Sequence, residues 1–582
     1  MNQKKSLYIF FSIMMIFVFV LGGCSPAVSP MHNASLIPEK KGADTNLAQE
    51  EEGDEDYSDE DWETEPTKVS PSQKSASDGP AVADLGFRPE KDGFNFENYG
   101  SEADAKNLTV EEIQRMFGDQ VCSSIQDGKC VLSPTGQQWM DATNNDMAGG
   151  HCEGFAALSL LMYANKVDEK QFGGNITHDL TLSSEKLQRE IAYWWATQAV
   201  SPTLDGLIKG TPNDILQELM TLKPGGETYT IGIYKRDGSG GHAITPFAVE
   251  DNGDGTYSVL VYDNNYPNDT RKLMIDSNNN TWSYEAAINP NVESEVYEGD
   301  AETQSLDLTP TSIRMGVQYC PFCASSDETA RGINGLAASA PKYNQVYLDG
   351  EGHLLIEDEK GNQLGYLEGK MVNKIPGAKY ASMKVDKPTL DSPEPIYMLP
   401  EGLDVKATID GSALKEESLT DLEMIGQGFS IGVEEIGLSP KQKDTVEFYP
   451  KDQIIVYDTD STESPNFVVT IEQANGTDYE FEIFGTDMEG GGTITVALDT
   501  KAGDLLINTE KLKNEGNFNI ILTRYTEKDE ESYEANDIVM KAGAIVYVNY
   551  SEWKGNGQGL LFGVDTNGDG EIDEEYTQED AK

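Results

Sequence analysis

The sequence predicts a multidomain chain in which an α+β domain is followed by all-β, sandwich-like modules. Two observations predict this order. Between residues 109 and 262, apolar residues first recur with a helical period and then alternate as they do in strands. From about residue 338 onward, many short β-branched and aromatic runs are separated by Gly, Pro, Asn and Asp. The length of 582 residues accommodates roughly two to four such domains.

The first residues predict an export signal. Lys4 and Lys5 precede an apolar run over residues 7–20, which is shorter than the about 20 residues that a transmembrane helix needs. Leu-Gly-Gly-Cys follows at residues 21–24. This motif resembles the lipobox of bacterial lipoproteins, which implies that residues 1–23 are removed and that the thiol of Cys24 is acylated. An ordinary secretory signal with a chance cysteine is the alternative.

The lipobox resemblance implies an extracytoplasmic protein that is held on the cell envelope by its lipid anchor. Residues 24–85 follow with few apolar residues, an acidic run at 50–56 and a Pro/Ser-rich stretch near Pro71. Such a chain cannot bury enough apolar surface to fold, and its like charges extend it. We therefore expect an acidic tether here; calcium buffering by the acidic run is the alternative.

The charge of the chain limits its partners. The formal net charge of −58 makes nucleic acid and anionic membrane surfaces poor partners. We expect an extracellular peptide or protein as the partner, and contact with the membrane through the lipid anchor only.

The remaining cysteines divide into two close pairs and one single residue. Cys122 lies near Cys130, and Cys320 lies near Cys323. Thiols outside the cell usually pair, so we interpret these as two disulfides. Redox chemistry at residues 320–323 is disfavoured because no apolar helix pattern follows, and zinc is disfavoured because no second ligand pair is near. Cys152 is left single, which raises a functional question.

The helical part begins with a capping box. Thr109 and Glu112 flank the start of an apolar-periodic run that reaches Gly118. Two further helices are expected, one from Ser184 and one from Pro212.

Cys152 opens the most apolar helix of the chain. Two glycines at 149–150 precede a nearly continuous apolar run over residues 152–163, as in a helix that is buried on most sides. The free N–H groups and the dipole at a helix N-terminus favour a thiolate. The alternative is an inert core cysteine.

Three strands are expected after the helices, at residues 229–234, 243–249 and 257–262. Pro246 argues for an edge or bulged position in the second of them. The turn at 251–255 joins the second and third strands as a hairpin.

The hairpin brings His242 close to the residues that follow the third strand. A two-residue turn pairs His242 with Asp263, whereas a four-residue loop pairs it with Asn265. In both registers the stretch 263–265 lies beside His242 on the neighbouring strand, and a carboxylate there can fix the tautomer and orientation of the imidazole.

A helix Cys, a strand His and an Asp on the next strand, in this order, resemble the papain-like cysteine peptidases. The phrases that carry the resemblance are Gly-Gly-His-Cys-Glu-Gly-Phe at 149–155, Gly-Gly-His-Ala-Ile at 240–244 and Val-Tyr-Asp-Asn-Asn-Tyr-Pro at 261–267. The nearest branch is that of the bacteriocin-processing leader peptidases. The resemblance implies that residues 86–325 form a papain-like domain that needs no cofactor for catalysis.

By this resemblance Cys152 is the nucleophile, His242 the general base and acid, and Asp263 the residue that orients His242. The family usually carries a Gln a few residues before the Cys, as a donor to the oxyanion. Here Asp146 has that spacing, and Asn144 or Asn145 are the candidate donors together with the backbone N–H of Cys152. Glu153, directly after the nucleophile, is expected to raise the thiol pKa.

These residues predict thiol hydrolysis of extracellular peptide or amide bonds. Two alternatives stay open. A transglutaminase-like acyl transferase uses the same order of Cys, His and Asp. A surface binding protein or adhesin would use a papain-like domain that has lost its activity.

The C-terminal half is expected to hold a β module at 338–450, a β-sandwich module at 451–550 and a tail at 551–582. No internal repeat is evident in its sequence. The segment at 361–366, together with 375–378, resembles a β-module common in secreted bacterial proteins. This resemblance does not identify a ligand.

The tail contains a sequence like the calcium loop of an EF-hand. Oxygen-bearing residues recur at alternate positions with a glycine at the sixth position, and calcium is therefore the expected cofactor. Position twelve is Tyr576 instead of the usual Glu, and Glu575 is the candidate substitute. The expected ligands are Asp565, Asn567, Asp569, Glu571 and Asp573.

Overall fold

The computed structural model describes residues 81–581 except 237, 239, 288–293, 317, 324–342, 386–393, 510 and 556. The expected signal sequence, Cys24 and the tether up to residue 80 therefore lie outside the described residues. Residues 75–582 form one compact unit. The chain is multidomain, with a small helical part and mostly antiparallel sheets, and it is 43% strand and 18% helix. This confirms the coarse fold class that the sequence predicts.

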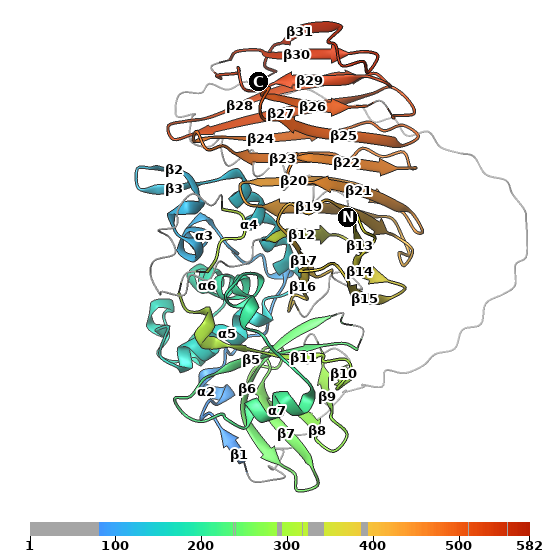
Figure 1. Cartoon of the computed structure of the whole chain (residues 1–582). Coiled ribbons are helices and arrows are strands. Elements are labelled where there is room, and N and C mark those ends of the chain that lie inside the picture. Colours follow the sequence, from blue (N-terminus) through green and yellow to red (C-terminus); the bar gives the residue numbers. More distant parts are fainter. Residues whose placement is uncertain are drawn as a thin grey trace, which may run out of the picture. The chain divides into compact units, whose positions relative to one another are not determined.

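The helices occupy the N-terminal part of the described chain (Figure 1). The predicted capping box is present at Thr109, and Gly118 caps the other end of the same helix. The α-helices are α2 Pro89–Asp92, α3 Val110–Phe117, α4 Pro134–Asp146, α5 Cys152–Tyr163, α6 Glu185–Ala196 and α7 Pro212–Leu219. Short 3₁₀ helices are η2 Ser101–Ala103, η3 Asp119–Val121, η4 Met147–Gly149, η5 Glu169–Phe172, η6 Thr177–Asp179, η7 Thr197–Ala199, η8 Leu204–Gly206 and η9 Thr311–Arg314.

An antiparallel sheet follows, in the order β10-β9-β8-β7-β6-β5-β11-β4, with β1 alongside β6. α7 packs against β6, β8, β9 and β11, and its apolar side chains share one buried cluster with this sheet. The strands are β1 Ala81–Asp84, β4 Ile208–Lys209, β5 Tyr229–Tyr234, β6 Gly241–Asp251, β7 Thr256–Tyr262, β8 Thr270–Asp276, β9 Thr281–Ala286, β10 Glu295–Asp300 and β11 Leu306–Pro310.

The β6–β7 hairpin is longer at its turn than a two-residue loop. Asp251 pairs with Tyr257, and Asn252 N–H donates to the Thr256 carbonyl at 3.1 Å. A register shift between Pro246 and Ala248 confirms the bulge that Pro246 predicts. Beyond it, Thr245 pairs with Tyr262. The two-residue turn is therefore wrong, and the register beside His242 is that of the longer loop.

The C-terminal strands form two large antiparallel sheets around one shared apolar core, which extends from Val346 to Phe562. The first has the order β16 Lys379–Ala381, β17 Ile396–Pro400, β12 Tyr343–Asp349, β19 Ser418–Gly426, β20 Phe429–Leu438, β23 Asn466–Glu472, β24 Thr477–Phe484, β27 Gly516–Thr526 and β28 Glu530–Met540. The second has the order β15 Lys370–Asn373, β14 Gln363–Leu367, β13 His353–Asp358, β18 Val405–Asp410, β21 Lys443–Tyr449, β22 Ile454–Thr459, β25 Gly492–Asp499, β26 Asp504–Asn508, β29 Ile545–Asn549, β30 Leu560–Asp565 and β31 Glu574–Gln578.

Successive hairpins alternate between these two sheets along the chain. The hairpins β19–β20, β23–β24 and β27–β28 extend the first sheet, and β21–β22, β25–β26 and β29–β30 extend the second. Strands before and after residue 450 belong to the same two sheets. The topology thus repeats although the sequence shows no evident repeat.

Two disulfides pair the cysteines in the way interpreted from the sequence. Cys122–Cys130 joins the strands β2 Cys122–Gln126 and β3 Lys129–Leu132, and Cys320–Cys323 closes a short loop. Among the described residues, Cys152 is the cysteine that lies outside these two disulfides. In the same part of the chain, no helix has the length and apolarity needed to cross a bilayer.

Candidate active site

Cys152 is the first residue of α5, at the helix end where the sequence places it. α5 is buried along almost its whole length, and the Cys152 side chain has no exposed surface. The neighbouring His151 ring points away, with Nδ1 at 2.8 Å from the Tyr99 carbonyl and Nε2 at 2.9 Å from Asn107 Oδ1. His151 therefore fixes the segment that precedes α5, and both of its ring nitrogens bind partners other than the Cys152 thiol.

His242 and Asp263 lie together, as the hairpin predicts. His242 is the second residue of β6, and Asp263 directly follows β7. His242 Nε2 is 2.9 Å from Asp263 Oδ1, and neither side chain is exposed. A carboxylate on Nε2 fixes the ring orientation and makes Nδ1 the nitrogen that would exchange a proton with a thiol.

Asp263 is held as a carboxylate. Tyr284 O–H donates to its Oδ2, and Asn265 N–H donates to its Oδ1 at 2.9 Å. Burial alone would raise the pKa of Asp263, but the His242 charge and these hydrogen bonds outweigh burial and hold the pKa below its usual value. A charged carboxylate in a buried site favours a protonated His242 beside it.

The thiol lies against the strand of His242. Ala243 N–H points at Cys152 Sγ over 3.4 Å, and Cys152, Ala156 and Ala243 share one small apolar cluster. Asn264 joins the two elements, because its Nδ2 donates to the Cys152 carbonyl at 3.1 Å and to the Ala243 carbonyl at 2.9 Å. The structure thus brings together the three residues predicted to be catalytic and adds Asn264 as a clamp that the sequence analysis missed.

Glu153 has a different role from the one expected for it. Its Oε1 accepts hydrogen bonds from Arg314 Nη2 and, at 3.0 Å, from Thr230 Oγ1. Its Oε2 is 3.7 Å from Lys384 Nζ. Burial lowers the pKa of Arg314 to about 9, still on the charged side of neutrality. The two cations offset the Glu153 charge, so the expectation that Glu153 raises the thiol pKa loses its physical basis.

The two candidate oxyanion donors are placed elsewhere. Asn144 uses its side-chain amide on Leu108, accepting from Leu108 N at 3.0 Å and donating to Leu108 O at 3.2 Å. Asn145 is exposed near the end of α4, whereas Cys152 is fully buried. The prediction of Asn144 or Asn145 as the donor is therefore wrong for this structure, because α4 directs both side chains to other surroundings.

A short segment from the C-terminal half covers the thiol. We call residues 382–385, which directly follow β16, the strap. The Lys384 carbonyl oxygen accepts from Cys152 Sγ at 3.2 Å and from Trp195 Nε1 at 3.1 Å. Val385 N–H donates to the Gly241 carbonyl at 2.9 Å, and Lys384 N–H donates to Gln198 Oε1 at 3.0 Å. Neither the strap nor Trp195 could be found from the sequence, since neither carries a local signal.

The glycines of the two Gly-Gly-His phrases make room for the strap. A Cβ on Gly150 would lie 2.2 Å from the Val385 carbonyl oxygen, and a Cβ on Gly241 would lie 2.4 Å from that of Met383. Gly150 also has a φ of 137°, which disfavours any side chain. Both glycines are therefore required where an extended backbone passes the thiol.

The predicted calcium loop is the turn between β30 and β31, without flanking helices. The Asp565 carboxylate accepts from the backbone N–H groups of Asn567, Gly568 and Gly570 at 2.7–3.1 Å. Asn567 Nδ2 donates to Asp573 Oδ2 at 3.2 Å. Tyr576 stacks on Phe562, at the position where an EF-hand has its bidentate carboxylate. Across the described residues, no group of three or more His, Cys, Asp or Glu side chains is arranged to hold a metal.

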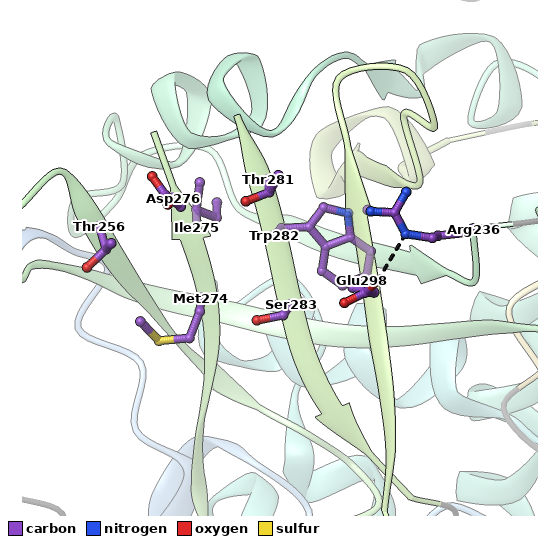
Figure 2. Close-up of a pocket in the computed structure, with 10 residues that line it drawn as sticks. Arg236, Thr256, Met274, Ile275, Asp276, Thr281, Trp282, Ser283 and Glu298 are labelled. Atoms are coloured by element: carbon purple, nitrogen blue, oxygen red, sulfur yellow. Dashed lines mark hydrogen bonds and ion pairs between the residues drawn. The ribbon is translucent and has the colours of Figure 1, made fainter. Parts of the chain in front are cut away.

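A separate pocket of about 300 Å³ lies on the sheet formed by β7–β10. Figure 2 shows Trp282 in this pocket beside the ion pair of Arg236 with Glu298. Neither Cys152, His242, Asp263 nor any strap residue lines it. It supplies no group to the site around the thiol.

Comparisons of the chain with protein-family models, with curated proteins and with solved structures find no match. Its function is therefore argued from the site itself.

Proposed function

We propose that this protein is a cysteine peptidase of the papain-like type, anchored outside the cell, that hydrolyses extracellular peptide bonds. The observation that carries the proposal is the buried set of Cys152, His242 and Asp263. The thiol opens a buried helix beside the His242 strand, and His242 Nε2 is bound to a carboxylate that is held in its charged form. These are the parts of a thiolate–imidazolium pair.

The reaction would proceed in two steps. The Cys152 thiolate attacks the substrate carbonyl carbon, a C–S bond forms, and His242 gives its proton to the amine as the C–N bond breaks. His242 then takes a proton from water, the hydroxide attacks the thioester, and the carboxylic acid leaves as the thiolate is restored.

The oxyanion needs hydrogen-bond donors that are fixed before the reaction. The backbone N–H of Cys152 at the start of α5 is one candidate. Trp195 Nε1 is the second, because it already donates to the carbonyl oxygen that lies at the thiol, that of Lys384. Trp195 thereby takes the place for which the sequence offered Asn144 and Asn145.

The proposal includes the export and anchoring read from the sequence. Acylation of Cys24 and the acidic tether would place the peptidase outside the membrane, where disulfides such as Cys122–Cys130 are stable. Metabolic labelling with a radioactive fatty acid tests this part, and we expect the label to disappear in Cys24→Ala.

The test of the catalytic proposal is the rate of alkylation of Cys152 by iodoacetamide as a function of pH. We use a chain that starts at Ser75, where the compact unit begins, so that Cys152 is its one cysteine outside the two disulfides. A thiolate–imidazolium pair gives an alkylation midpoint well below the free-thiol pKa of about 8.5. We expect such a low midpoint, and we expect it to move to about 8.5 or above in His242→Ala.

His353→Ala is the matched control, because His353 lies on β13 and pairs with Glu394. It should leave the midpoint unchanged. A midpoint near that of a free thiol, indifferent to His242, contradicts the peptidase proposal. In that case a surface binding protein with an inactive domain becomes the working hypothesis. Release of ammonia from a glutamine side chain, with transfer of its acyl group to a primary amine, would identify the transglutaminase-like alternative.

A further inference from the structure

We propose that the strap occupies the substrate site, and that the Lys384 side chain fills an acidic pocket which selects substrates with a lysine at the residue whose carbonyl is attacked. This inference rests on the proposed peptidase function and adds two properties to it. The chain covers its own active site, and the enzyme cleaves after lysine.

The strap is bound as a substrate backbone would be. The Lys384 carbonyl oxygen lies at the nucleophile and receives the Trp195 N–H, and the next residue, Val385, donates its N–H to the carbonyl of Gly241, beside His242. Gly150 and Gly241 allow this backbone to pass without overlap. The carbonyl that faces the thiol therefore belongs to Lys384, and its side chain marks the adjoining specificity pocket.

The Lys384 side chain is surrounded by groups that suit an ammonium ion. Nζ is 3.1 Å from Asp307 Oδ1, 3.2 Å from Thr309 Oγ1 and 3.7 Å from Glu153 Oε2. Tyr234 O–H donates to the other oxygen of Asp307 at 2.9 Å and keeps that carboxylate oriented. Lys384 as a whole is 2% exposed, so its charge is removed from water and depends on these partners.

The pocket also has the shape of an extended lysine. Gly232 on β5 leaves the space, because a Cβ there would lie 2.4 Å from Lys384 Cε and 2.5 Å from Asp307 Oδ1. A branched or larger side chain in place of lysine would collide with Gly232 and Asp307. A pocket of about 100 Å³ lies beside Lys384 and is also lined by Gln198, Tyr234 and Asp307.

The first experiment measures whether the strap covers the thiol. Lys384→Gln removes the ammonium ion, and Val385→Pro removes the N–H that binds Gly241 while leaving the acidic pocket intact. Both variants should raise the alkylation rate of Cys152 about tenfold or more at every pH, since about 1.4 kcal/mol of lost strap binding changes an equilibrium tenfold. Lys379→Gln is the matched control, because the ammonium ion of Lys379 pairs with Asp205 and lies over the Tyr343 ring. It should leave the rate unchanged.

The second experiment measures selectivity with the Lys384→Gln and Val385→Pro variants. The fluorogenic peptides differ only at the residue whose carbonyl is attacked, which is Lys, acetyl-lysine, norleucine or Glu. They are compared by kcat/KM. We expect cleavage after Lys to exceed cleavage after the three others by about tenfold or more, as for a buried charged pair. Adding Asp307→Asn or Gly232→Ala to either variant should remove this preference.

The outcomes separate the two proposals. Equal cleavage of all four peptides overturns the lysine pocket and leaves the peptidase function standing. If the alkylation rate is unchanged in both strap variants, the proposal that the strap covers Cys152 is overturned. Absence of cleavage together with a thiol midpoint indifferent to His242 overturns the peptidase function, and the lysine inference with it.

Discussion

Tyr284 connects the Asp263 carboxylate of the candidate active site to strand β9 through a hydrogen bond. It lies on β9 and donates its O–H to Asp263, which in turn binds His242. Burial raises the pKa of Tyr284 well above its ordinary value, and the Asp263 charge raises it further. The phenol therefore stays a donor, and it stabilises Asp263 in the charged form on which a protonated His242 depends.

Tyr284→Phe should shift the alkylation midpoint of Cys152 upward. Losing one hydrogen bond to a buried carboxylate raises the Asp263 pKa and weakens the imidazolium, so we expect a shift of about one pH unit, or about 1.4 kcal/mol. The shift should be smaller than that of His242→Ala. Tyr257→Phe on β7 serves as the control and should not shift the midpoint. A Tyr284→Phe midpoint equal to the wild-type value would show that Tyr284 acts only in packing.

At the residue scale, the sequence predicted groups that carry a local signal and missed those that do not. Cys152 was marked by its helix start and His242 by its hairpin. Trp195 lies in the apolar last turns of α6, where nothing in the neighbouring sequence marks its indole N–H. Lys384 is one lysine among many. Their roles depend on contacts between segments far apart in the chain.

At the scale of elements, local rules predicted the ends of helices well and the register of the hairpin less well. The capping box at Thr109 and the start of α5 follow from side chains within one turn. The β6–β7 register depends on the loop length and on one extra residue near Pro246. Pro246 predicts a bulge, but the turn residues fit more than one loop, so two registers remained possible from sequence.

The sequence of the turn between β30 and β31 predicts a calcium site, but the geometry of this turn supplies only part of the ligands that such a site needs. Its oxygen donors suit calcium, but the residue at position twelve is Tyr576, and Asp565 is occupied by backbone N–H groups. We expect one weak calcium ion here, with a Kd of about 10⁻⁴–10⁻³ M, as in extracellular modules.

Titration calorimetry with calcium tests this expectation, because a chain of net charge −58 also collects calcium diffusely. Asp569→Ala should remove the one stoichiometric site. Asp254→Ala, in the acidic turn between β6 and β7, removes the same charge and should retain the site. Identical isotherms for wild type and Asp569→Ala would leave the loop as an acidic turn.

At the scale of the whole molecule, the C-terminal β part and the N-terminal helical part share contacts that the sequence cannot reveal. The strap follows β16 and reaches Cys152 on α5, and α4 packs on β12, β19, β20, β23 and β24. Alternating apolar residues predicted the strands, but not that hairpins would alternate between two sheets with one core. Which strand pairs with which depends on contacts outside the local sequence, such as Phe429 with Ile471 and Ile454 with Ala497, and no local pattern encodes them.

The sheet under α4 carries carboxylates that are costly to ionise. Glu423 on β19 and Glu434 on β20 share a hydrogen bond and are half-buried. Burial first, and then repulsion from Asp421, raise the pKa of Glu423 to about 8. Burial first, and then the Glu423 charge, raise the pKa of Glu434 well above its usual value.

These two groups predict that the protein is less stable at pH 8 than at pH 5. A carboxyl group with a raised pKa binds protons more tightly in the folded state, so its contribution is fully present below the unfolded pKa of about 4.3 and is lost as the pH rises through the folded pKa. The loss should therefore fall between about pH 4 and pH 8. Glu434→Gln keeps the shape without the charge, and it should raise the thermal midpoint at pH 8 while changing it little at pH 5. Glu359→Gln, at an exposed turn, makes the net charge less negative by the same amount and controls for general repulsion. Equal gains from both substitutions at pH 8 would assign the pH dependence to overall charge and not to this pair.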